Sequence, residues 1–204
     1  MELLLSFMSW GGLSAVLIAV SGLHYMWGIV SGQVPRPVRS TWGIWAVLGL
    51  LLLLTYSGSG ARVDSTLLAA WIGFINPVII FFLALKFGTF EWKRLDTVCV
   101  AICVVSLAVW WWTNDPFMGL IGLLVTDAMG ALPQVRATWK QPGDEPVFPW
   151  AMFCLGSAVN LLAVDQWTVT HYLYPVYMTV ASAFIVLPLI VYRIAVVIIR
   201  RSQQ

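Results

Sequence analysis

The sequence predicts an all-α integral membrane protein with seven transmembrane helices. Of its 204 residues, 60% are hydrophobic and only 10% are charged, whereas charged residues make up about 25% of an ordinary soluble domain. Several uncharged apolar runs also reach roughly 18 residues or more, the length that spans a bilayer. This composition excludes a soluble enzyme, a nucleic-acid-binding protein and a secreted disulfide scaffold, and it makes the lipid bilayer the expected partner.

Turn residues and charges delimit the first three expected helices, at residues 7–30, 41–57 and 65–86. The N-terminal stretch before the first helix lacks the basic region of a signal peptide, so we expect the first helix to be retained. Segment 31–37 contains two prolines and a glycine and ends the first helix, and a Ser-Gly-Ser-Gly run at 57–60 ends the second.

Four further helices are expected at 95–113, 116–138, 148–164 and 169–198. Three consecutive Trp at 110–112 mark the outer end of the fourth helix, because indole rings favour the headgroup region. The second and sixth helices are short and are expected to sit nearly upright in the membrane. The seventh is long enough that its last turns are expected to protrude into water.

Lys and Arg residues are distributed unequally between the two sides of these seven helices. Ten of the 11 fall on one side, and only Arg62 falls on the other. Because basic residues concentrate in cytoplasmic loops, the N-terminus is expected outside and the C-terminus in the cytoplasm. The sequence therefore predicts a multi-pass protein of the cell (inner) membrane. The ten residues are Arg36, Arg39, Lys86, Lys93, Arg94, Arg136, Lys140, Arg193, Arg200 and Arg201.

An internal repeat relates the first three helices to the last three. Shifting the chain by about 108 residues places Gly22 on Gly130 and Trp42 on Trp150. The prediction is a 3+1+3 arrangement of parallel repeats: residues 1–94 form the first repeat, 95–114 the linker helix and 115–204 the second repeat, within one membrane domain. Parallel repeats of this kind occur in transporters, with the binding site near the midplane between the halves.

The segment Gly-Ala-Leu-Pro-Gln-Val-Arg at 130–136 lies at the inner end of the fifth expected helix. A Pro-Gln pair in this place, followed by a basic loop and a Pro-containing helix start, resembles the PQ-loop and SWEET group of transporters. The resemblance implies seven helices in a 3+1+3 plan, an outside N-terminus and alternating-access transport of a small solute. The seventh helix lacks the Asn found in the sugar carriers of the group, which favours another, bacterial branch.

Asp127 is the most informative candidate site residue, because it lies about halfway along the fifth expected helix. An Asp at the bilayer centre costs about 2.5–3.5 kcal/mol, so it should face the bundle or a cavity. Asp127 and Gln134 are seven residues apart and share one helix face with Gly130. We interpret Asp127 as a proton-coupling or cation-binding site, with Gln134 beside it. The alternative is a structural hydrogen bond between helices.

Five further residues are candidate binding residues. Asn76 and Asn160 carry amides that need partners on another helix or on a ligand. Trp71, Tyr174 and Ser182 are candidates for the wall of a cavity, since aromatic walls suit sugars and small organic cations. The alternative interpretations are helix–helix hydrogen bonds for the amides and core packing for the others.

Three prolines inside the expected helices are candidate hinges, namely Pro133, Pro77 and Pro175. Proline removes a backbone hydrogen bond and loosens a helix, as alternating access requires. The alternative is that the kinks only improve packing, because membrane helices tolerate proline.

The favoured interpretation is a small-solute carrier, with a proton as a candidate coupling ion. A non-transporting membrane assembly or receptor-like protein of the same fold is the alternative. We expect no enzyme activity, no metal and no cofactor. The three cysteines lie in apolar runs, and no metal-binding or nucleophile motif is present. A homo-oligomer is compatible with the sequence, because lipid-facing and partner-facing apolar surfaces look alike.

Overall fold

The computed structural model describes residues 9–34, 36–58, 65–90 and 92–202, apart from the side chains at 65, 133 and 137. This part of the chain forms seven helices, and the prediction of an all-helical protein is confirmed. Residues 7 and 8, the start of the first expected helix, lie outside the described residues. The helices are α2 (Trp10–Ser31), α3 (Arg39–Gly58), α4 (Ser65–Phe87), α5 (Arg94–Thr113), α6 (Pro116–Lys140), α7 (Val147–Leu161) and α8 (Val169–Ser202).

Six of the described helices are long and apolar enough to cross a membrane, which is typical of a multi-pass membrane protein. The exception is α7, which is apolar but has only 15 residues. At a rise of 1.5 Å per residue it is about 22 Å long, less than the roughly 30 Å of the hydrocarbon core. The prediction of a helix at 148–164 was wrong at its C-terminal end, because residues 162 and 163 form a turn.

Local signals in the sequence set the helix ends. Ser9 caps α2 by accepting a hydrogen bond from the Gly12 backbone N–H at 3.1 Å. Gly32 ends α2 in the left-handed conformation, with a φ of 72°, where a side chain would be strained. The Asp115 carboxylate accepts from the Phe117 N–H at 2.9 Å and starts α6, in which Pro116 takes the first position.

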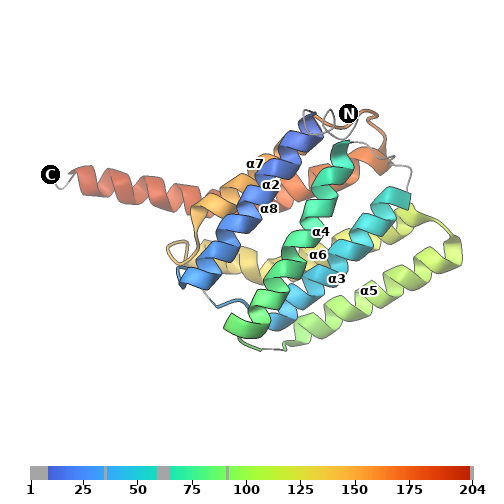
Figure 1. Cartoon of the computed structure of the whole chain (residues 1–204), viewed down its shortest axis with the longest axis horizontal. Coiled ribbons are helices and arrows are strands. Elements are labelled where there is room, and N and C mark those ends of the chain that lie inside the picture. The colour runs from blue at the N-terminus through green and yellow to red at the C-terminus, as the bar shows by residue number, and fades with distance from the viewer. Residues whose placement is uncertain (1–8, 35, 59–64, 91, 203–204) are drawn as a thin grey trace.

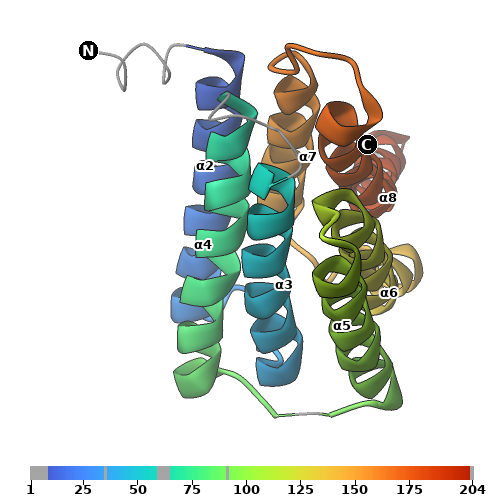
Figure 2. The same cartoon turned by 90° about the vertical axis from the view of Figure 1, so that its right-hand side faces the viewer.

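Two sets of three helices pack in the same way. Helix α4 packs against both α2 and α3, and helix α8 packs against both α6 and α7. Between the sets, α2 packs against α7 and α3 packs against α6. Helix α5 packs mainly against α6, and Figure 2 shows it at the edge of the bundle, away from α2.

The α2–α3, α4–α5 and α6–α7 loops lie at one end of the bundle, which we call the basic end (Figure 1). Arg39 joins the first two loops there: its Nε donates to the Ala84 carbonyl at 3.0 Å and its Nη2 to the Gly88 carbonyl at 3.2 Å. An isolated bridge between Val38 and Thr89 reinforces this link. The arginine thus satisfies carbonyls at the C-terminal end of α4, as favoured by the helix dipole.

The last turns of α8 extend beyond the rest of the bundle as a single rod (Figure 1). The helix has 34 residues and continues to Ser202, four residues past the expected end. Ile194, Ile198 and Ile199 are each more than half exposed on this extension. The end of α8 therefore combines exposed aliphatic side chains with Arg200 and Arg201, a composition typical of the membrane interface.

Candidate functional site

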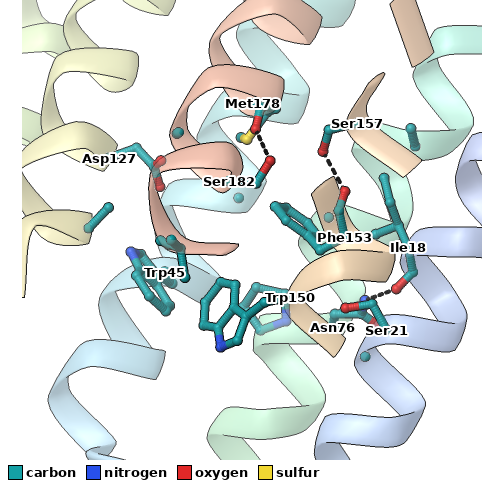
Figure 3. Close-up of a pocket in the computed structure, with 18 of the residues that line it drawn as sticks. Ile18, Ser21, Trp45, Asn76, Asp127, Trp150, Phe153, Ser157, Met178 and Ser182 are labelled. Atoms are coloured by element: carbon teal, nitrogen blue, oxygen red, sulfur yellow. Dashed lines mark hydrogen bonds between the residues drawn. The ribbon is translucent and has the colours of Figure 1, made fainter. Parts of the chain in front are cut away.

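A cavity of about 160 Å³ lies between the two sets of helices (Figure 3). Six helices line it: α2, α3, α4, α6, α7 and α8. No residue of α5, which is described over its whole length, reaches the cavity. The cavity is thus shared by both sets of three helices and excludes the helix that connects them.

Asp127 reaches this cavity from α6, and Figure 3 shows its carboxyl group directed toward the open space. One carboxyl oxygen, Oδ2, accepts a hydrogen bond from the Tyr177 hydroxyl of α8 at 2.6 Å. No hydrogen bond to the second oxygen is found among the described residues, so the carboxyl group presents one bonded and one available oxygen. This arrangement suits either a proton or a cation on the cavity side.

Asn76 lies on the opposite wall, on α4. Its Nδ2 donates to the Ile18 carbonyl of α2 at 3.0 Å (Figure 3). The close approach depends on Gly22, because a Cβ atom there would overlap with the Asn76 amide. Ser21 lines the same side and donates to the Pro149 carbonyl of α7 at 2.7 Å. These bonds fix three helices around one side of the cavity.

Four aromatic rings line the cavity on the side of the basic end, near the end of α2 and the starts of α3 and α7. Tyr25 lies between Trp42 and Trp150, with ring centroids 5.5 and 6.4 Å away, and Trp45 packs edge-on against Trp42 at 5.1 Å. All four residues line the cavity. The Trp150 indole also donates to the carboxylate of Glu145 at 3.3 Å. We call Tyr25, Trp42, Trp45 and Trp150 the aromatic cluster.

Two tyrosines pack together on the side away from the basic end, and one of them, Tyr174, lines the cavity. The rings of Tyr56 and Tyr174 lie 5.0 Å apart, and both residues are buried. The Tyr56 hydroxyl contacts Thr66 at 3.1 Å and the His171 carbonyl at 3.2 Å. Hydrogen bonds and ring contacts therefore tie the start of α8 to α3 and α4 at this end.

Two polar atoms of cavity-lining residues have no hydrogen-bond partner among the described residues. One is the indole N–H of Trp45 and the other is the amide oxygen of Asn160, which is only 2% exposed. Buried polar atoms are normally paired, so an unpaired donor and an unpaired acceptor on residues that line one cavity are groups for which a ligand could supply the partner.

Five of the residues singled out in the sequence line this cavity: Asp127, Asn76, Asn160, Tyr174 and Ser182. Their functional roles stay predictions.

Trp71 and Gln134 do not line the cavity. Trp71 is 47% exposed, and it is five residues from Asn76, which rotates it by about 140° to another face of α4. Gln134 shares a helix face with Asp127 but lies about 10 Å further along the axis, toward the basic end. Its buried Nε2 has no partner among the described residues.

The three candidate hinges lie inside helices. Pro77 lines the cavity from α4, and Pro175 is fully buried in α8. Pro133 lies in α6, and its side chain is outside the described part of the structure. Their roles as hinges stay predictions.

The aromatic cluster is the feature that sequence reasoning missed. Trp42 and Trp150 had been paired by the 108-residue shift, and this pairing was the available signal. The pairing by itself does not show that the two indoles reach one cavity. Contacts across three helices, which no single-helix pattern reveals, distinguish a cavity wall from an interfacial belt.

The described cavity-lining residues include one carboxylate and no Lys, Arg or His. Within the described ranges, no three His, Cys, Asp or Glu side chains come together as a metal site. None of the family models, curated proteins or solved structures compared with this chain matches it. The function therefore has to be inferred from the site itself.

Proposed function

We propose that this chain is a small-solute membrane carrier of the PQ-loop and SWEET type that works by alternating access. The observation that carries the proposal is the central cavity, which six helices share and the connecting helix α5 does not reach. In this proposal α2–α4 and α6–α8 are the two repeats, α5 is the linker, and the two repeats rock about the cavity.

The helix packing supports the 3+1+3 plan. In each set the third helix packs against the first and the second, as α4 does in one set and α8 in the other. The first helix of each set also packs against the second helix of the other, giving the α2–α7 and α6–α3 pairs. A twofold relation between repeats produces this reciprocity. The basic end is the cytoplasmic side in the proposal, which puts the N-terminus outside.

Asp127 is the proposed coupling residue, because it is the only carboxylate among the described cavity-lining residues. Its hydrogen bond to Tyr177 also supports the alternative, a non-transporting assembly or receptor-like protein in which Asp127 only ties α6 to α8. The two functions differ in one property: a carrier must expose the cavity to both sides of the membrane in turn.

Cysteine accessibility tests this property without knowledge of the substrate. The native thiols are first removed by Cys99→Ala, Cys103→Ala and Cys154→Ala. Ala181→Cys then places a thiol on the cavity wall of α8, and Val180→Cys places one on the neighbouring exposed face. A membrane-impermeant thiol reagent is added to the outside of cells or to inside-out vesicles.

We expect Ala181→Cys to react from both sides and Val180→Cys to react from neither, because lipid covers the exposed face. Reaction of Ala181→Cys from one side only would favour the receptor-like alternative. Reaction from neither side would favour a structural assembly protein. Either result would contradict the carrier proposal.

A further inference from the structure

We propose that the solute bound in this cavity is a small organic monocation with a hydroxyl or N–H group, which binds Asp127 in exchange for a proton. The transport of this cation rests on the proposed carrier function, whereas its binding does not. The inference comes from four properties of the cavity: its charge, its rings, its size and its two unpaired polar atoms.

The first property is the charge around Asp127. No Lys, Arg or His is found among the described residues that line the cavity. The titratable groups facing Asp127 from the neighbouring helices are Tyr174 and Tyr177 on α8 and Cys99 and Cys103 on α5, and none of them carries a positive charge. An isolated ionised carboxylate in an apolar interior is costly. Asp127 therefore needs either a bound proton or a bound cation.

The rings argue for an organic cation over a bare metal ion. Six aromatic residues line the cavity, and three of them, Trp42, Trp45 and Trp150, are tryptophans. Trp is the ring that attracts a cation most strongly, and such cages are typical of quaternary ammonium recognition. A metal ion would instead need several oxygen ligands, and Asp127 is the only carboxylate among the described residues of the wall.

The size of the cavity limits the ligand. Its volume is about 160 Å³, and an apolar cavity of about 150 Å³ accommodates benzene. Pockets for drug-sized ligands measure about 300–1,000 Å³. The cavity therefore fits a compact cation, and choline is a suitable probe.

The two unpaired polar atoms add a second requirement. The Asn160 oxygen can only accept a hydrogen bond and the Trp45 indole N–H can only donate one. A ligand hydroxyl both donates and accepts, so it can satisfy either atom. Choline should therefore bind more tightly than tetramethylammonium, which has the same charged centre but no hydroxyl.

The exchange balances in protons and charge. Protonated Asp127 releases one proton when one monovalent cation binds, and the ionised carboxylate and the cation then neutralise each other. The site stays neutral in both states, and one proton is exchanged for one cation. Because the proton competes with the cation, raising the pH strengthens binding, by up to about tenfold per pH unit while the carboxyl group is protonated.

Isothermal titration of choline into the full chain in lipid nanodiscs tests the inference. Repeating the titration in two buffers of different ionisation enthalpy counts the protons released. The neutral isostere 3,3-dimethylbutan-1-ol serves as the matched ligand control, because it has the shape and hydroxyl of choline without the charge. We expect one proton per choline, binding that strengthens with pH, and much weaker binding of the alcohol with no proton release.

Variants separate the contributions. Asp127→Asn should abolish proton release and most of the affinity. Trp45→Leu should weaken choline about tenfold or more, whereas Trp71→Leu, on the exposed face of α4, should leave it unchanged. Asn160→Leu should weaken choline but not tetramethylammonium. Size-exclusion profiles check that each variant is folded, and the comparison of choline with the alcohol needs no variant.

Equal binding of choline and the alcohol, or choline binding without proton release, would overturn the inference. No binding of choline or tetramethylammonium to the wild-type chain would do the same. If these ligands fail while Ala181→Cys reacts from both sides, the carrier proposal stands and the cation inference fails. If choline binds with proton release while Ala181→Cys reacts from one side only, the cation site stands and the carrier proposal fails.

Discussion

Two main interfaces join the two sets of helices, and they differ in the side chains and the kind of contact that form them. In the α2–α7 interface, Ser14 and Ser21 donate to the Gly156 and Pro149 carbonyls, each at 2.7 Å. Gly156 is packed so closely that a Cβ atom there would lie 2.7 Å from Ile18. In the α3–α6 interface, bulky apolar side chains pack instead. Its buried members include Leu48, Leu52, Leu120 and Leu123.

The two interfaces differ in how strongly they resist sliding of one set of helices along the other. A hydrogen bond is directional, and the two serines, seven residues apart, meet carbonyls that are also seven residues apart. This spacing fixes the register of α2 against α7. Dispersion contacts between leucines are not directional, so the α3–α6 interface tolerates small shifts at lower cost. Asp127 lies on α6, the helix of the second interface.

The largest expected effect comes from truncating the apolar interface. Leu123→Ala removes a side chain that is fully buried between α3 and α6. The cavity that it leaves should cost about 2–5 kcal/mol of unfolding free energy. Denaturant or thermal unfolding in detergent measures this loss. Val125→Ala, on the exposed face of the same helix, is the control and should change stability little.

The second prediction enlarges a residue in the close interface. In Gly156→Ala the new Cβ would meet Ile18 and the Ser14 carbonyl oxygen, at 2.7 and 3.1 Å. Helix α2 must then move away, at a cost of about 1–3 kcal/mol.

Gly130→Ala is its counterpart in the other interface, where the Cβ would lie 3.3 Å from the Trp45 indole nitrogen. We expect the smaller loss of unfolding free energy for Gly130→Ala, because only the Trp45 side chain has to move, whereas Gly156→Ala displaces backbone atoms. Equal losses in a parallel unfolding assay would contradict the proposed difference between the interfaces.

The helices were predictable from the sequence because each is encoded locally. Apolar runs, the Ser9 and Asp115 caps and the glycine at 32 are signals carried by neighbouring residues. The depth of Asp127 in its span was visible for the same reason. The α2–α7 interface was not, since it depends on which serine faces which carbonyl more than a hundred residues away. The aromatic cluster likewise required the packing of three helices.

The third prediction removes the hydrogen bonds that fix the register. Ser14→Ala and Ser21→Ala should each cost about 0.6 kcal/mol, the average measured for hydrogen bonds between membrane helices, and at most about 1.7 kcal/mol. Ser57→Ala is the matched control, because the Ser57 hydroxyl bonds within its own helix and is exposed. Unfolding of both single variants and of the double variant gives the coupling between them. Losses no larger than that of Ser57→Ala would show that close packing alone holds α2 against α7.

The smallest effect is expected on a face that belongs to neither interface. Trp71 is 47% exposed on α4 and lies outside the cavity. Trp71→Leu keeps an apolar side chain toward lipid, so the unfolding free energy should change by less than about 0.5 kcal/mol. The elution volume in size-exclusion chromatography should also stay the same. A clear loss of stability together with later elution would contradict a lipid-facing Trp71, because it would mean that this face of α4 packs against a second copy of the chain.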